Sequence, residues 1–347
     1  MNLANDTPFA VAALPATGPE GLPIFTVIVK GTFEVRSGAA ASVAADQLPV
    51  AYGDEPLGEN GAMRWEADTA PFKPRADVVI VGSAHAPGGQ PVPYLDLGIR
   101  VADRRAGVRV FGDRVWEKES RASRPVPFAT LELSAERAFG GVSPSGGFCE
   151  ENPVGKGFVV VDKKQEAVGA PLPNIEAIEQ PIHTWNDHPK PVGFGVYPRS
   201  AQPRLGFLGT YDRAWRERRS PLPPEDFRFE YFNCAYPSLQ FDGYLRGNEE
   251  VELIHLTPDG RLLFRLPGVQ LRLDVGRFAP TLPGVAGGVG QEQTPAAGPP
   301  GEALRMVLDT LLLFPEENKC ALVWRGHCRV ASLEVPEIET VTVRLAG

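Results

Sequence analysis

Two histidines and a few glycine-rich strings are the residues of this sequence whose types and spacing could do chemistry. His183 and His188 flank Asp187, and a metal ion could take all three as ligands. Zinc sites, however, show tighter and more recurrent ligand spacings. We therefore expect two loop histidines that hydrogen-bond or face solvent, and we expect no metal and no cofactor.

Three short strings come close to known motifs, and each fails at a position that the chemistry needs. The string from 141 to 145 lacks the final glycine of a nucleophile elbow. Gly157 stands where a phosphate loop needs a Ser or Thr for magnesium, and Pro198 replaces the third glycine of a dinucleotide fingerprint. Carboxylates adjacent in sequence, such as Glu225 and Asp226, would point to opposite faces of a strand. The motifs therefore favour a protein that is not an enzyme.

Composition narrows the class of protein further. The chain has 347 residues, of which 43% are hydrophobic and 22% charged, which is typical of a globular protein with a sizeable core. Lys and Arg number 35 against 43 Asp and Glu, giving a net charge of −8. Such a chain has no electrostatic footprint for nucleic acid or an anionic membrane, so we expect neither as a partner. It also has no apolar run of the ~20 residues that a spanning helix needs.

The elements that must position these residues are mostly strands. The 37 glycines and 35 prolines disfavour long helices. Apolar side chains alternate with period 2 in many segments. These segments are 25–35, 77–81, 95–101 with 108–110, 251–266, 269–275, 304–324 and 338–345. The sequence predicts a mainly β fold of packed antiparallel sheets, sandwich-like, with few short helices.

Three local features refine this prediction. The strands around 95–110 form a hairpin with Gly107 near the exit of its turn. Two segments have a helical pattern, one from Leu131 to Phe139 and one from Asp212 to Arg218. Asp212 is placed to cap the second.

Two regions lack the alternating pattern. Residues 140–237 are rich in Gly, Pro, Asn and aromatic residues, which is typical of segments that cover a core or carry function. Residues 279–301 are rich in Gly and Pro with a single charge, which predicts a flexible loop. No clean linker separates the early from the late strands. We expect one body over 1–347, and a subdivision within 140–237 remains the alternative.

The cysteines and the N-terminus point to the cytoplasm. The four cysteines show no dense or paired spacing, which is typical of reduced, buried thiols. They are Cys149, Cys234, Cys320 and Cys328, and the last two could meet across a hairpin. The apolar run from Phe9 to Leu14 is too short for a signal peptide, and Lys30 is the first basic residue.

Ten dense strings remain that match no catalytic motif. They are Pro71–Val78, Gly82–Pro87, Gly112–Trp116, Glu136–Gly141, Asn152–Phe158, Leu172–Glu176, Gly209–Trp215, Pro221–Phe227, Leu308–Thr310 and Val323–Arg325. In this order they resemble a bacterial domain-of-unknown-function family of type VI secretion accessory proteins, which is encoded beside VgrG spike, PAAR and pentapeptide-repeat genes. The resemblance runs from about residue 25 to about residue 325.

The resemblance implies an adaptor or chaperone that couples a secreted effector, or PAAR-bearing cargo, to the tip of the VgrG spike. It implies these proteins as partners and implies no catalysis. Two other classes stay open. One is a hydrolase that acts on glycans with a site within 140–237, and the other is a structural component of the secretion spike.

The candidate partner-binding residues lie in the middle of the chain. They are Arg137, Phe139, Gly140, Gly141, Asn152, Tyr211, Asp212, Trp215, Asp226 and Phe227. The first five predict a loop pinned by a guanidinium and an amide, and Tyr211 to Trp215 predict a capped helical turn with an aromatic anchor. We favour structural pinning over direct contact with a partner, because glycines at fixed offsets answer backbone needs.

Overall fold

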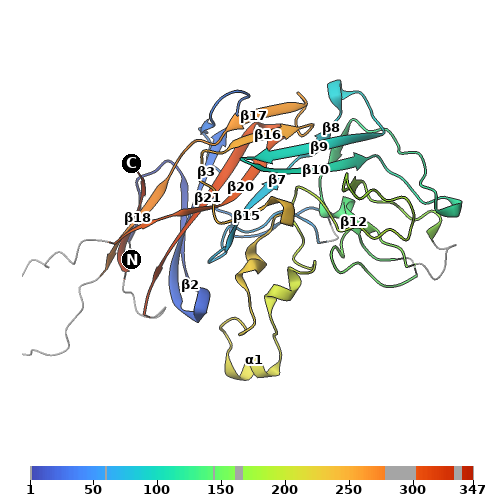
Figure 1. Cartoon of the computed structure of the whole chain (residues 1–347). Helices are drawn as coiled ribbons and strands as arrows, with labels where there is room; N and C mark the ends of the chain where they lie inside the picture. The colour runs from blue at the N-terminus through green and yellow to red at the C-terminus, as the bar shows by residue number, and fades with distance from the viewer. Residues whose placement is uncertain are drawn as a thin grey trace, which may run out of the picture.

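The chain folds into packed β-sheets from which one helical segment projects (Figure 1). The computed structural model describes residues 2–58, 61–143, 145–160, 167–277, 302–331 and 338–346. Strands make up 42% of the structure and helices 11%, so the predicted mainly β class with packed antiparallel sheets is confirmed. The loop predicted over 279–301 lies outside the described residues.

Three sheets hold most of the strands. The largest has the order β15 (Gln240–Asp242), β7 (Arg75–Ile80), β20 (Val307–Phe314), β21 (Lys319–Arg329), β3 (Pro23–Glu34) and β2 (Ala10–Thr17), with β4 (Ser42–Val43) paired to β3. The second has the order β14 (Ile175–Glu176), β10 (Arg104–Phe111), β9 (Tyr94–Val101), β16 (Glu250–Ile254) and β17 (Arg261–Arg265). The third has the order β1 (Asn2–Asn5), β22 (Ile338–Leu345), β18 (Leu271–Arg277) and β19 (Glu302–Arg305).

The remaining elements are short. Three two-stranded pairs join β8 (Ser83–His85) to β11 (Thr130–Glu132), β12 (Phe139–Gly140) to β13 (Lys156–Gly157), and β5 (Glu55–Pro56) to β6 (Met63–Trp65). The α-helix is α1 (Arg213–Arg218). The 3₁₀ turns are η1 (Pro19–Gly21), η2 (Pro87–Gly89), η3 (Lys118–Ser120), η4 (Ala135–Arg137), η6 (Leu205–Leu208), η7 (Phe229–Phe232), η8 (Pro237–Leu239) and η9 (Pro315–Glu317). In the part of the chain that is described, no helix has the length and apolar character needed to cross a membrane.

The C-terminal hairpin occupies the middle of the largest sheet. Strands β20 and β21 lie between β7 on one side and β3 on the other. Strand β7 pairs with β20 in parallel, whereas β21 pairs with both β20 and β3 in antiparallel. Strands β7 and β3 are therefore joined in this sheet through β20 and β21, which come much later in the sequence than either.

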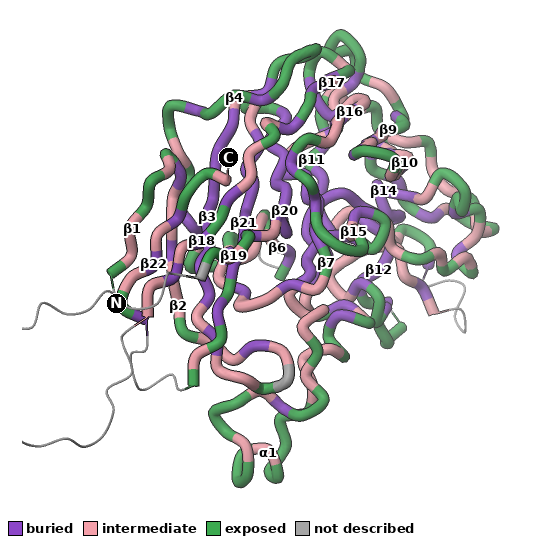
Figure 2. The backbone as a smooth tube through the Cα atoms, turned by 60° about the vertical axis from the view of Figure 1, so that its left-hand side comes forward, coloured by how far each residue is buried: buried purple, intermediate pink, exposed green. Residues whose placement is uncertain are grey.

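The largest sheet has two buried faces of different character. Directly paired residues share a face of a sheet. Val29 pairs with Trp324, and both belong to the apolar core shared with the other two large sheets. Lys30 pairs with Val323, which in turn pairs with Thr310, so these residues lie on the opposite face. Polar side chains on that face, such as Lys30 and Thr310, are as buried as the apolar core, and Figure 2 shows buried residues along the strands of this sheet.

Two of the local predictions are wrong. Residues 131–139 form no α-helix, because Thr130–Glu132 pairs with β8 and Phe139–Gly140 pairs with β13, so that sheet hydrogen bonds replace the helical ones. Gly107 is not at the turn either. The register of β9 with β10 leaves Ala102 and Asp103 to turn the chain, with Ala102 at φ 54°, and places Gly107 opposite Gly98.

The cysteines are free and buried, as predicted. Cys320 and Cys328 both lie on β21, so they do not face each other across a hairpin. The other predicted hairpins, 251–266 and 304–324, correspond to β16–β17 and β20–β21 and are confirmed. One body or a subdivision within 140–237 stays a prediction. A small separate core joins residues of that part of the chain, such as Leu172 and Trp185, to Trp116 from the preceding segment.

Candidate functional site

Residues 205–227, which we call the lobe, project away from the sheets with α1 at their tip (Figure 1). The helix begins where the Asp212 carboxylate accepts the backbone N–H of Trp215 at 2.8 Å, which is the predicted cap. Arg213 and Glu217 form an i,i+4 ion pair at 2.7 Å. No residue of α1 is buried. The helix is therefore held by its cap and by contacts within the lobe.

Aromatic side chains give the lobe its shape. The rings of Tyr211 and Trp215 meet edge to face with their centroids 4.5 Å apart. The indole N–H of Trp215 donates to the carbonyl of Leu222 at 2.9 Å, which ties α1 to the returning chain. Tyr211 nevertheless keeps 49% of its surface exposed, and Leu222 keeps 40%. The predicted aromatic anchor is confirmed, and it leaves an apolar surface in solvent.

A cleft of about 360 Å³ opens between α1 and the turn that follows it. Its lining residues are Thr210, Asp212, Ala214, Trp215, Arg218, Arg219, Pro224, Glu225 and Asp226. The Asp226 carboxylate accepts the backbone N–H of Thr210 at 2.9 Å and its hydroxyl at 2.7 Å. These bonds lower the pKa of Asp226 and keep it ionised. Three of the predicted residues, Asp212, Trp215 and Asp226, thus line one cleft.

The other predicted set forms a buried pin. The Asn152 amide donates to the carbonyls of Ala135 at 2.8 Å and Phe139 at 3.0 Å. A Cβ added at Gly140 would lie 2.1 Å from the carbonyl oxygen of Asn152, so only glycine fits there. All four residues of this pin are buried, namely Phe139, Gly140, Gly141 and Asn152. The amide half of the predicted pin is confirmed, and direct contact of these four residues with a partner would require the loop to open.

The guanidinium contributes less to this pin than the amide. Arg137 is half-buried and donates to the Asn174 side-chain oxygen at 3.3 Å. The pin and the lobe are separate but joined at their bases. The backbone N–H of Gln202 donates to the carbonyl of Glu150 at 2.8 Å, and the Tyr197 hydroxyl donates to the carbonyl of Glu151 at 2.9 Å. These bonds join the segment before the lobe to the segment before Asn152.

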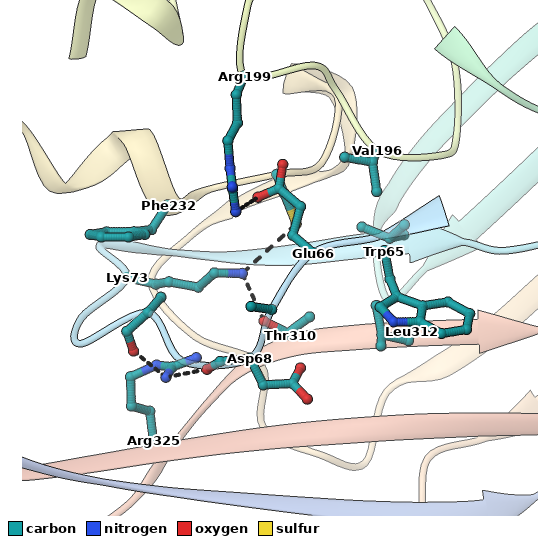
Figure 3. A pocket seen from close by; sticks show the side chains of 14 residues that line it. Trp65, Glu66, Asp68, Lys73, Val196, Arg199, Phe232, Thr310, Leu312 and Arg325 are labelled. Carbon is teal, nitrogen blue, oxygen red and sulfur yellow. Dashed lines mark hydrogen bonds and ion pairs between the residues drawn. The ribbon is translucent and has the colours of Figure 1, made fainter. Parts of the chain in front are cut away.

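A network of buried charges lies beneath the base of the lobe (Figure 3). The Lys73 ammonium donates to the Asp77 carboxylate at 2.6 Å and to the Thr310 hydroxyl at 2.9 Å. The Arg325 guanidinium pairs with Asp309 at 2.7 Å. These residues come from β7, β20, β21 and the loop before β7. They tie the polar face of the largest sheet together.

A second part of the network reaches the lobe. Arg204, immediately before the lobe, pairs with Glu66 at 2.6 Å, and Arg199 pairs with the same carboxylate at 3.0 Å. Lys30 on β3 pairs with Asp68 at 2.9 Å. Sequence reasoning missed these five residues, since an isolated charge in an apolar strand or loop carries no visible sign of its partner.

The network has no reactive nucleophile. Burial raises the pKa of the Cys234 thiol to about 12, so it stays protonated. Burial by itself would lower the pKa of Lys73, but the Asp77 and Asp309 carboxylates and the other groups around the ammonium together outweigh burial, and the pKa is raised. The cavity between these residues has a volume of about 20 Å³, which is room for about one water molecule. The network therefore ties the polar face of the largest sheet to the loops beside it, and its cavity has no room for more than about one water molecule.

Comparison with family models identifies the chain. The model of DUF2169, described as an uncharacterized protein conserved in bacteria, matches residues 20–325. The chain belongs to this family. Comparison with curated proteins and with solved structures gave no match. The matched range agrees with the extent of the predicted resemblance, and the DUF2169 description assigns no activity.

Six of the ten strings that carried the resemblance meet in three pairs in this DUF2169 structure. Arg114 pairs with Glu176, joining two strings, and Thr210 with Asp226 joins two more. Lys73 and Thr310, from strings at opposite ends of the chain, meet in the buried network. The strings therefore mark the polar contacts that position the loops.

The residues that suggested catalysis have structural partners. The Asp187 carboxylate accepts the backbone N–H groups of His183 and Thr184, both at 2.8 Å. The His188 ring lies 3.0 Å from the carbonyl of Val159. Over the described ranges, no three His, Cys, Asp or Glu residues are grouped as metal ligands would be.

A hollow of about 800 Å³ lies between η3 and residues 184–186. Glu119 is the one carboxylate among the described residues that line it. A glycosidase uses a pair of carboxylates. Among the described residues of this hollow no second carboxylate is present to form such a pair, and the hydrolase alternative stays a prediction.

Proposed function

We propose that this DUF2169 protein is a cytoplasmic adaptor of type VI secretion, which holds an effector or PAAR-bearing cargo for loading onto the VgrG spike tip. The proposal rests on the collinear strings, which resemble accessory proteins of that system over nearly the whole chain. The family match supports the bacterial family and its extent. The secretion role itself is our inference.

The lobe is the feature that best supports a binding role. It carries Tyr, Trp and Arg side chains, which are the residue types that dominate the energy of protein interfaces. Tyr211 and Leu222 remain exposed, so the lobe presents apolar side chains to solvent. A rigid base of buried ion pairs presents this surface, which limits the ordering cost of binding.

Co-expression with the effector encoded beside the gene tests the proposal. We expect the two proteins to co-elute in size exclusion, and we expect deletion of this gene to abolish secretion of that effector. Separate elution together with unchanged secretion would refute the adaptor role. A trimer that assembles with VgrG without cargo would favour the spike component, and release of sugars from peptidoglycan would favour the hydrolase.

Variants of the lobe sharpen this test. Trp215→Ala should abolish co-elution, because the side chain shapes both the exposed surface and the cleft. Tyr52→Ala is the matched control, since Tyr52 is 73% exposed on a loop far along the chain from the lobe. Equal loss of binding in both variants would show that the lobe is not the contact.

A further inference from the structure

The second sheet has one face in the apolar core and one face toward solvent. Successive side chains of a strand alternate between the two faces, and the inward set on β9, β10, β16 and β17 belongs to the core. We call the opposite side of these four strands the outer face. On β14, at the border of this face, Glu176 is buried and pairs with the buried Arg114. The charged residues of the outer face are Asp96, Arg100, Arg105, Arg109, Glu250, Glu252, Arg261 and Arg265.

The outer face therefore carries five guanidinium groups and three carboxylates, in a chain whose net charge is −8. Ion pairs neutralise four of these residues as one group. The Arg100 guanidinium pairs with Glu250 at 2.5 Å and with Glu252 at 3.1 Å. Glu252 also pairs with Arg261 at 2.6 Å. Two positive and two negative charges thus cancel at the centre of the face.

Two guanidinium groups remain after the last carboxylate is counted. Asp96 pairs with Arg109 at 2.6 Å. Arg105 and Arg265 are exposed, and among the residues that the structure describes no carboxylate lies within 4.0 Å of either. Arg105 lies directly opposite Arg100 across β10 and β9, and like charges in that position cost stability. The outer face thus keeps two positive charges that the fold does not pair.

The strand register sets the distance between these two charges. Arg105, Arg100, Glu252 and Leu263 form one row across the four strands. Arg265 lies on β17 two residues beyond Leu263. Three strand spacings across the sheet and two residues along a strand place the Cα atoms of Arg105 and Arg265 about 16 Å apart. An extended segment of about five or six residues spans this distance.

A hollow of about 300 Å³ lies at the Arg265 end of this span. Leu263, Ala39 and Ala40 are among the residues that line it. Glu250 is the one carboxylate among its described lining residues, and it is bound to Arg100. The hollow therefore offers room for an apolar side chain beside an unpaired guanidinium.

We propose that the outer face docks an acidic segment of a partner protein, which crosses the strands with one carboxylate on Arg105 and another on Arg265. The charge count selects this occupant. A basic segment would place like charges against both guanidinium groups, and an uncharged segment would remove water from them without supplying a counter-ion. Arginine forms fork-like pairs with carboxylates, which adds geometric selectivity to the attraction.

This surface is separate from the lobe. Figure 1 shows β9, β10, β16 and β17 at the top of the molecule and α1 at the bottom. A partner on the outer face therefore leaves the lobe free for another. The inference goes beyond the proposed function in this respect, because it gives the protein a second contact surface that does not involve the lobe.

A peptide titration tests the inference without the natural partner. The probe is fluorescein-labelled hexaglutamate, which is about 20 Å long when extended, followed by anisotropy with the full chain at low salt. We expect hexaglutamate to bind, and triglutamate, which is about 10 Å long and reaches one guanidinium only, to bind about tenfold more weakly. Raising the salt to about 0.5 M should weaken the hexaglutamate complex.

Charge reversal identifies the surface. Arg105→Glu combined with Arg265→Glu should weaken hexaglutamate binding by about tenfold or more, because two attractions become repulsions. The matched control is Arg216→Glu combined with Arg218→Glu on α1. Those two arginines are also exposed, and their reversal changes the net charge by the same amount. We expect the control to bind within about twofold of wild type, since charges beyond a Debye length are screened.

Equal weakening by the two double variants, or no binding of hexaglutamate at low salt, would overturn the inference. Thermal melting checks that each variant is folded. If the doubly reversed variant does not fold, Arg105→Gln combined with Arg265→Gln decides, and it should weaken binding by several fold relative to the same change at Arg216 and Arg218. Effector co-elution tests the adaptor role separately, because neither peptide titration depends on it.

Discussion

Arg325 and Asp309 form an ion pair at 2.7 Å in which 3% and 1% of the two side chains remain exposed. They project from neighbouring strands, β21 and β20, close to a register shift between Leu308 and Thr310. The guanidinium also donates to the carbonyl of Asp68 at 2.9 Å. The pair therefore joins the centre of the largest sheet to the loop that covers it.

Removing one partner of this pair should be costly. Arg325→Met leaves the Asp309 carboxylate buried without its counter-ion, and we expect a loss of about 3–5 kcal/mol in the free energy of unfolding. Arg36→Met is the control, because its pair with Glu34 is on the surface and should be worth about 0–1 kcal/mol. Urea unfolding measures both. A similar small change in the two variants would contradict a structural role for the network.

The glycine pin predicts a second stability difference. Gly141 has φ +85°, and an added Cβ would lie 2.1 Å from the carbonyl oxygen of Gly155. Gly141→Ala should cost about 3 kcal/mol through overpacking and backbone strain. Gly53→Ala, where no atom lies within 4 Å of the added Cβ, should change the stability by about 0.5 kcal/mol or less. Thermal unfolding measures the loss of stability in both variants.

Loss of the helix cap should act locally. Asp212→Ala removes the acceptor for the Trp215 N–H and should destabilise α1 by about 1 kcal/mol. We expect faster hydrogen exchange at amides 215–219 and an unchanged midpoint of global unfolding, since no α1 residue is buried. Asp46→Ala, an exposed position in another loop, should alter neither. A lower global midpoint would show that the lobe supports the core.

The buried thiols should be unreactive at neutral pH. Burial raises the pKa of Cys320 and of Cys234 to about 12, so the thiolate fraction at pH 8 is on the order of 10⁻⁴. We expect negligible labelling by iodoacetamide in the native protein and labelling of all four cysteines in denaturant. Any residual native rate should rise about tenfold per pH unit, since the thiolate fraction does so below the pKa. Rapid labelling of Cys234 would contradict its environment.

The strands were accessible to sequence reasoning, but their order was not. Period-2 alternation identifies a strand and its two faces, and the turn at Thr257–Gly260 specifies a hairpin between neighbours. Neither signal identifies which distant strand lies beside a given strand. The placement of β20 and β21 between β7 and β3 depends on pairing between ends of the chain, for which one sequence offers no local signal.

In the candidate site, likewise, the contacts between neighbours in sequence were predicted and the contacts between distant residues were missed. The cap at Asp212 and the anchor at Trp215 depend on residues three or four positions apart, and both were predicted. The Lys30–Asp68 pair depends on a strand meeting a loop 38 positions away, and it was missed. The error at 131–139 has a related cause, because its apolar spacing suits a helix while tertiary pairing with β8 prevails.

The position of the C-terminal hairpin bears on how the chain is made. A ribosome releases β3 and β7 long before β20 and β21, which are the strands that complete the sheet between them. During that interval the edges of β3 and β7 that later receive the hairpin are open to other chains. The β9–β10 and β16–β17 hairpins have only local turns to close and can form as they emerge. Biosynthesis of this protein should therefore depend on chaperones until β20 and β21 have left the exit tunnel, and a nascent chain stalled before β20 should aggregate.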